Sequence, residues 1–75
     1  MNIDQQLDVR GLSCPLPILR AKRVLDGLDS GAVLQVIATD PGAVKDFESF
    51  AEQTGNALLD SVQTGDQYRI RLRKK

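Results

Sequence analysis

The chain has 75 residues, of which 41% are hydrophobic and 27% charged, and its ten basic side chains are balanced by ten acidic ones. This composition is typical of one small folded domain with a single sheet and a layer of helices, and it argues against a disordered chain. Proteins that bind mainly phosphate backbones are usually basic overall, so the zero net charge argues against direct nucleic-acid binding as the main role. We expect a single domain over residues 1–75.

The composition also limits the cellular compartment and the kinds of reactive site that we expect. No apolar run approaches the ~20 residues of a membrane-spanning helix, and the first residues lack the apolar core of a signal peptide. We therefore expect a cytoplasmic protein without membrane contact, whose cysteine stays reduced. The absence of histidine and the presence of a single cysteine, Cys14, exclude a histidine base, a cysteine–histidine zinc site and an internal disulfide. We predict no metal and no cofactor.

The first predicted strand runs directly toward the cysteine. Leu7 and Val9 alternate with polar residues within 6–10, a pattern typical of a half-buried strand, and a short connection from Gly11 then leads to Cys14. From Pro15 to about residue 28 the apolar period becomes that of a helix, which glycines at 27 and 31 end. Its apolar face consists of Ile18, Ala21, Val24, Leu25 and Leu28.

The middle of the chain predicts a central strand followed by a second helix. Residues 32–38 are almost continuously apolar and include β-branched residues, as expected of a central strand. Asp40 is suited to be the N-cap of the next helix, and Pro41 to its first position, where a missing N–H has no consequence. Gly55 is placed to end this helix in a left-handed conformation. Its buried stripe is Ala43, Val44, Phe47, Phe50 and Ala51.

Two further strands are predicted at the end of the chain, at 57–64 and 67–73, joined by a Gly65–Asp66 turn that indicates an antiparallel hairpin. The element order is then βαβαββ. With only two helices, the simplest α+β arrangement is a two-layer sandwich with a mixed four-stranded sheet. The sequence does not decide the order of the strands in that sheet.

Cys14 is the candidate reactive group. Unpaired N–H groups and the positive end of the dipole at a helix start favour thiolate, but a dipole effect of ~0.3–1 kcal/mol lowers a pKa by less than about one unit. Arg20, Lys22 and Arg23 add little because solvent screens them. Pro15 and Pro17 stiffen the segment and indicate a sulfur held in the open. The alternative is that Cys14 is a small buried apolar residue, as unpaired cysteines often are.

A second candidate lies on the first helix. A helical wheel places Leu16 and Leu19 beside Arg20 and Arg23, away from the buried face. Exposed leucines among arginines, next to a reactive thiol, indicate a partner-docking patch. Equally, single leucines on a protein surface are common and need no function.

The remaining charged residues receive structural interpretations. The basic cluster near the C-terminus is interpreted as the solvated face of a strand, with contact to RNA or an acidic partner as the alternative. Asp40 and Asp46 are interpreted as a cap and a first-turn acid rather than as catalytic carboxylates. The cluster comprises Arg69, Arg71, Arg73, Lys74 and Lys75.

Several of these features together resemble the TusA/SirA-like sulfur carrier family. The stretch from Leu7 to Pro17 is similar to that family's N-terminal signature, in which a strand with Leu-Asp leads through Gly11-Leu12 to Cys14-Pro15-x-Pro17. Asp40-Pro41 ahead of Asp46-Phe47 is a second match, and Gly55 a third. The resemblance spans almost the whole chain, and residues 1–75 are identified as one sulfur carrier domain.

The resemblance implies a βαβαββ two-layer sandwich and a function for Cys14. The cysteine would accept sulfane sulfur from a cysteine desulfurase or a rhodanese, hold it as a persulfide and pass it to a downstream acceptor protein. In one branch of the family the sulfur reaches the 2-thiouridine of tRNA, the destination favoured here; other branches serve molybdenum-cofactor, sulfur-oxidation or selenium pathways. The chain departs from many members at Asn56, where they carry a histidine, and this leaves the branch open.

Two other functions remain as alternatives to sulfur relay. The protein could be a non-covalent regulatory or binding module in which Cys14 is incidental, or a thiol-redox sensor that forms a sulfenic acid or an intermolecular disulfide. A carrier needs one nucleophilic sulfur and no resolving cysteine, which agrees with the composition. Partner enzymes would supply acid–base groups, so the chain is not expected to be a stand-alone enzyme. We expect a monomer.

Overall fold

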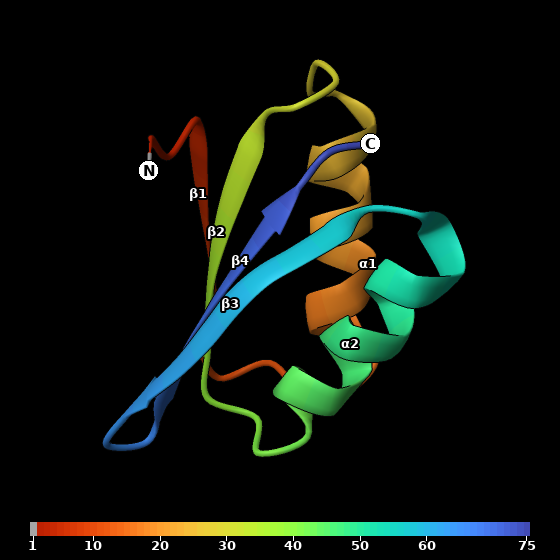
Figure 1. The fold of residues 1–75 in the computed structure, drawn as a ribbon. Helices are drawn as coiled ribbons and strands as arrows, with labels where there is room; N and C mark the ends of the chain where they lie inside the picture. The colour runs from red at the N-terminus through yellow and green to blue at the C-terminus, as the bar shows by residue number, and fades with distance from the viewer. Residues whose placement is uncertain (1) are drawn as a thin grey trace.

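Two helices cover one face of a four-stranded sheet in the computed structural model, which describes residues 2–75 (Figure 1). The predicted βαβαββ order is confirmed. In chain order the elements are β1 (Gln5–Val9), α1 (Leu16–Asp26), β2 (Val33–Ala38), α2 (Ala43–Thr54), β3 (Ala57–Thr64) and β4 (Gln67–Arg73).

The sheet has the strand order β1-β2-β4-β3. β1 pairs with β2 in parallel, and β4 lies antiparallel between β2 and β3. The crossovers through α1 and α2 both advance in the same direction across the sheet, so two right-handed connections place both helices on the same face. Because both helices lie on one face, the fold is the predicted two-layer sandwich. It also leaves the other face of the sheet without helices (Figure 1).

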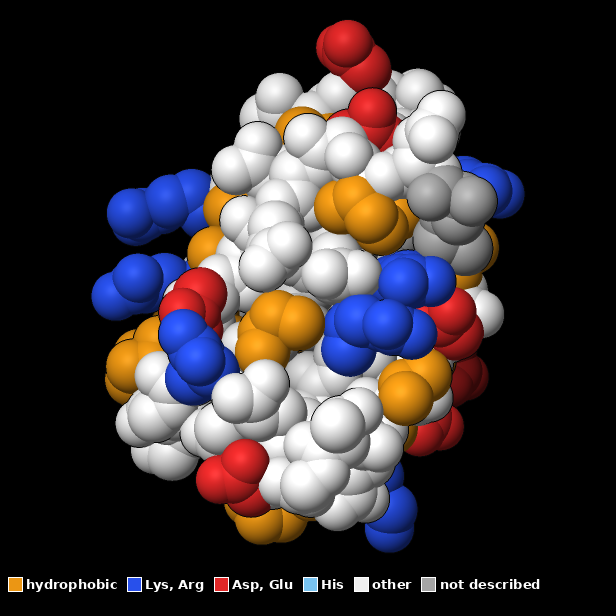
Figure 2. Space-filling model, turned by 90° about the vertical axis from the view of Figure 1, so that its left-hand side faces the viewer, with side chains coloured by type: hydrophobic (Ala, Val, Ile, Leu, Met, Phe, Trp, Pro, Cys, Tyr) orange, Lys and Arg blue, Asp and Glu red, His pale blue; other side chains and the backbone are white. Residues whose placement is uncertain are grey.

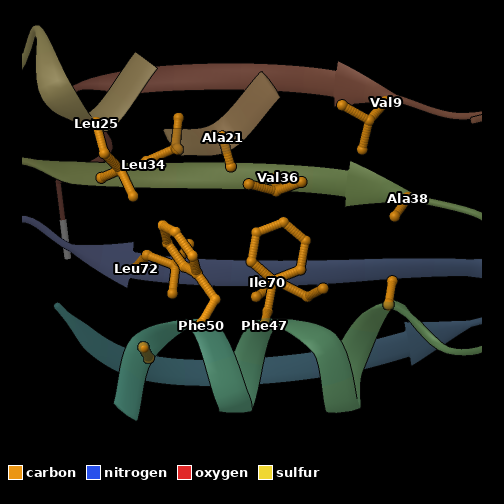
Figure 3. Close-up of a cluster of buried hydrophobic side chains, with 12 residues drawn as sticks. Val9, Ala21, Leu25, Leu34, Val36, Ala38, Phe47, Phe50, Ile70 and Leu72 are labelled. Carbon is orange, nitrogen blue, oxygen red and sulfur yellow. The ribbon is translucent and has the colours of Figure 1, made fainter. Parts of the chain in front are cut away.

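The core lies between the helices and the covered face of the sheet. Phe47 and Phe50 of α2 make an edge-to-face contact with ring centroids 6.2 Å apart. In Figure 3, Phe47 lies by Val36 and Ile70 of the two central strands. Ala21 of α1 lies near Val36, and Leu25 of α1 lies beside Leu34. The predicted apolar stripes of both helices therefore do face the sheet. The buried cluster comprises Val9, Ala21, Leu25, Leu34, Val36, Ala38, Ala43, Phe47, Phe50, Ala51, Ile70 and Leu72.

The helix ends differ in detail from the sequence prediction. α1 begins at Leu16 with Pro15 at its N-cap, and Pro17 is buried in its first turn. α2 begins only at Ala43, with Gly42 as N-cap and no side-chain cap. The prediction that Asp40 caps this helix was therefore wrong. Gly55 does end α2 as expected, with the left-handed φ of 82° that glycine tolerates best.

The open face of the sheet carries a row of polar contacts across the strands. Arg71 donates from Nε to Gln35 Oε1 at 3.1 Å and forms an ion pair with Asp60 at 3.3 Å. Arg71 thus stabilises strand pairing, in agreement with the structural interpretation of the basic cluster. Figure 2 views this side of the molecule, where basic and apolar side chains are interspersed. Neither helix of the described chain is long and apolar enough to cross a membrane.

Candidate functional site

The site forms at the edge of the sheet where the parallel strands β1 and β2 both end. Val9 and Ala38 are partners in the register, so the connections that follow them leave the sheet together. Hydrogen bonds join these connections: Gly11 N donates to Thr39 Oγ1 at 2.9 Å, and Cys14 N donates to Asp40 Oδ2 at 3.0 Å. The loop that contains Cys14 is therefore fastened to a second loop that is far away in the sequence.

The Cys14 side chain is exposed at this edge, as the sequence analysis expected. It lies two residues before α1, joined to Pro15 by a cis peptide bond. Gly11 has a φ of 81°, a left-handed conformation that lets the chain turn sharply after β1. The rigid connection places the sulfur on the surface, where a partner protein can reach it.

Two carboxylates flank the cysteine, one on each side of the start of α2. Asp40 accepts from the Cys14 backbone through Oδ2 and from Gly42 N through Oδ1 at 3.2 Å. Asp46, in the first turn of α2, is the carboxylate with the largest effect on the pKa of the Cys14 thiol. A β-carbon at Gly42 would lie 3.9 Å from Asp40 Oδ1 and 4.0 Å from Asp46 Oδ2, so both carboxylates border one small space.

These carboxylates make the thiol less acidic, contrary to expectation. The hydrogen bond to Asp46, partial desolvation and the negative charges of Asp46 and Asp40 together raise the pKa of Cys14 above its usual value. Two backbone donors at the helix start are directed to other acceptors, since Leu16 N donates to Ser13 O at 2.9 Å and Cys14 N to Asp40 Oδ2 at 3.0 Å. The prediction of a moderately activated thiol at a helix start was therefore wrong for the free protein.

Asp40 and Asp46 were missed as site residues by the sequence analysis. A signal was nevertheless present, because a right-handed crossover makes consecutive strands parallel and brings their carboxyl ends to the same edge. Residues after β1, including Cys14, should then meet those after β2, including Asp40. Within residues 2–75, no group of three or more side chains is arranged to hold a metal ion, and this applies to the cysteine and its carboxylates too.

Asp40→Ala should destabilise the protein by about 1–2 kcal/mol, because two backbone N–H groups lose a charged acceptor. Thermal or urea unfolding measures the loss, with Asp29→Ala, an acid in an exposed loop, as the control. Asp40→Asn keeps an acceptor oxygen, so its free energy of unfolding should fall by less than that of Asp40→Ala. If Asp40→Ala and the native protein unfold at the same temperature, Asp40 does not stabilise the two loops through its hydrogen bonds.

The second candidate patch is also on the surface. The side chains of Leu16 and Leu19 are 45% and 56% exposed. Together with Arg20 and Arg23 they line a shallow hollow of about 110 Å³ on α1. The structure thus brings together the four residues that the helical wheel grouped. We call this surface the α1 patch.

Asn56, the position at which the chain departs from the family pattern, lies away from the cysteine. It is buried at the start of β3, where its Nδ2 donates to Thr54 Oγ1 at 2.9 Å and its Oδ1 accepts from Lys75 N at 3.0 Å. Ala57, the next residue, is in register with Arg73 and, through it, with Val33 at the beginning of β2. Asn56 therefore joins elements at the opposite edge of the sheet from Cys14.

Comparison with known proteins gives consistent results. A family model described as "Sulfurtransferase TusA" matches residues 5–74. The chain is 56% identical over 73 residues to the sulfur carrier protein TusA of Allochromatium vinosum, covering 97% of this chain and 96% of that one. The crystal structure of a SirA-like protein from Desulfitobacterium hafniense has the same fold, with a TM-score of 0.82 at 22% identity, covering 92% of this chain and 95% of that one.

Proposed function

The chain belongs to the sulfurtransferase TusA family, and from this premise we propose that it is a sulfur carrier that holds sulfane sulfur as a persulfide on Cys14. The observation that carries the proposal is the exposure of its single cysteine in a rigid connection at the sheet edge. A sulfur that partner active sites must reach has to lie on the surface. A chain without a second cysteine also cannot expel the bound sulfur by forming an internal disulfide.

The transfer step needs no oxidant or reductant. The Cys14 thiolate attacks the terminal sulfur of a persulfide on the donor, the donor's S–S bond breaks, and the donor cysteine leaves as a thiolate. The proton given up by Cys14 balances the one that the departing thiolate takes up. Passing the sulfur on repeats the same exchange, with an acceptor thiolate attacking the terminal sulfur of the Cys14 persulfide.

We assign the donor to the cysteine desulfurases or rhodaneses, and the destination of the sulfur to 2-thiouridine in tRNA through a downstream acceptor protein. The zero net charge supports a protein acceptor rather than direct contact with tRNA. On this proposal residues 1–75 act as a single carrier domain, a cytoplasmic monomer between encounters with its partners.

Sulfur loading tests the proposal directly. The protein is incubated with a cysteine desulfurase and cysteine, separated from them and weighed by mass spectrometry. We expect a gain of about 32 Da, the mass of one sulfur atom, which a reducing agent removes. A chain that never gains this mass with any desulfurase or rhodanese tested is not a carrier. Adducts of oxygen or disulfide-linked dimers under the same conditions would favour the redox-sensor alternative.

We propose that the α1 patch docks the sulfur donor. It lies on the helix that begins two residues after Cys14, so a partner seated on it is within reach of the sulfur. Exposed leucines supply apolar contact, and the arginines favour an acidic partner surface.

Leu19→Asp should weaken donor binding by roughly tenfold or more, because it places a carboxylate in the apolar part of a contact and opposite acidic partner groups. Stability should change by less than about 0.5 kcal/mol, since Leu19 is exposed. Binding is measured by calorimetry or by the rate of sulfur loading. Val62→Asp is the matched control: Val62 is 41% exposed on β3, away from α1. If both variants bind the donor equally well, the α1 patch is not the docking surface.

A further inference from the structure

We propose that the face of the sheet left uncovered by the helices docks a protein other than the sulfur donor, one whose contact surface carries carboxylates among apolar side chains. We call this the Arg69 surface and define it by Ile37 of β2, Val62 of β3, and Arg69 and Arg73 of β4. The α1 patch belongs to the helix layer, on the other side of the sheet (Figure 1). The acidic protein can therefore stay bound while a donor occupies the α1 patch, which goes beyond the carrier function.

The strand register places the side chains of this surface next to one another. Arg69 is in register with Ile37 on one side and with Val62 on the other. Residues directly opposite each other in neighbouring strands point to the same face of a sheet. Ile70, the next residue of β4, is fully buried in the core beneath the helices, so Arg69 points to the uncovered face. Arg73, four positions along the same strand, points the same way.

Arg69 lacks a partner for its charge. Its side chain is only partly exposed, and its Nε is buried without a hydrogen-bond partner among the described residues. Buried polar atoms in native proteins nearly always have a partner, so an orphaned one needs an explanation. The carboxylates that the strands carry on this face do not supply it, because Asp8 is paired with Arg10 at 2.8 Å and Asp60 with Arg71 at 3.3 Å. A carboxylate from outside the chain would complete the environment of Arg69.

Exposed apolar side chains on the same surface favour a protein over a nucleic acid. Val62 is 41% exposed and Ile37 is half-buried, and Figure 2 shows apolar and basic side chains interspersed on this side of the molecule. Such groups contribute little to binding a phosphate backbone, whereas protein interfaces combine apolar contact with arginines. Arg69 and Arg73 form no ion pair within residues 2–75, so both are available to acidic groups of the partner.

The spacing of the two arginines suits an extended acidic segment. Arg69 and Arg73 are four positions apart on one strand, about 13 Å at ~3.3 Å per residue. An extended segment lying along β4 presents its own side chains with the same period, so carboxylates at alternate positions reach both guanidinium groups. The partner surface that fits best is therefore a strand-like segment with alternating acidic and apolar residues.

A peptide titration followed by NMR tests the proposal on the whole isotope-labelled protein. The probe is a capped peptide of about ten residues in which glutamate and valine alternate, and a peptide of alternating lysine and valine is its control. We expect the acidic peptide to shift the amide signals of Ile37, Val62 and Arg69, and the basic peptide to leave them unchanged. Arg69→Gln should raise the Kd of the acidic peptide at least about fivefold. Lys45→Gln, which removes the same charge from an exposed position on α2, should leave the Kd unchanged.

Two further measurements apply if Arg69→Gln fails to fold. Arg73→Gln, at an exposed position, should also raise the Kd, and so should added salt, because it screens the attraction between carboxylates and arginines. Shifts confined to α1, or equal Kd values for Arg69→Gln, Arg73→Gln and Lys45→Gln, would overturn the proposal.

Other occupants of the Arg69 surface would be recognised in the same experiment. Stronger shifts of the same amides with a single-stranded oligouridylate would assign the surface to a nucleic acid. Shifts that depend on protein concentration without any peptide would assign it to a second copy of the chain. Either result would overturn the proposal. Because neither a donor nor sulfur takes part, these results are independent of whether Cys14 carries a persulfide.

Discussion

Cys14→Ser is expected to abolish sulfur loading completely. The hydroxyl of serine is a far weaker nucleophile than a thiol at neutral pH and forms no stable bond to sulfane sulfur, and the chain has no other cysteine to replace it. After incubation with a cysteine desulfurase and cysteine, the variant should show no gain of about 32 Da, whereas the native chain should show it fully. This is the largest effect we expect on function, because it removes the only atom that can carry the sulfur.

The fold of Cys14→Ser should be unchanged. The side chain is exposed, and its backbone N–H still reaches Asp40, so the free energy of unfolding should differ by less than about 0.5 kcal/mol. Donor binding should also persist, since the α1 patch is intact. A variant that folds, binds the donor and still acquires sulfur would show that the sulfur is held elsewhere and would end the carrier proposal.

The fold could be predicted because each element has a clear local pattern. Leu7 and Val9 alternate as in a strand, and the apolar stripes of both helices, including Ala21 and Phe47, recur at helical spacing. The strand order could not be predicted, because two right-handed crossovers are compatible with more than one sheet. Asp40 has the short acceptor side chain ahead of a proline that is typical of an N-cap, but α2 begins later, with Gly42 as its N-cap. The Asp40 carboxylate instead accepts from Cys14 N and Gly42 N.

The candidate site could be predicted only in part, for a physical reason. The exposure of Cys14 and the grouping of Leu16 with Leu19 depend on local structure, which sequence periodicity describes well. The acidity of the thiol depends instead on charges that the fold brings together across 26 and 32 positions, those of Asp40 and Asp46. A local argument from the helix dipole therefore gave the wrong direction for the pKa of Cys14.

Phe47→Ala is expected to destabilise the protein by about 3–5 kcal/mol, through lost burial and the cavity that the ring leaves. Phe47 is the largest fully buried side chain, packed between α2 and the central strands (Figure 3). A domain of 75 residues has a total stability of about 4–11 kcal/mol at the usual value per residue, so the variant should be close to unfolding at 25 °C. Urea unfolding followed by circular dichroism measures the loss.

The control for this variant is Ser49→Ala, an exposed position on the same helix, which should change stability by less than about 0.5 kcal/mol. Phe47→Leu keeps a branched apolar side chain, so it should lower the free energy of unfolding by less than Phe47→Ala does. Unfolding energies that are alike for Phe47→Ala and Ser49→Ala would contradict the core packing.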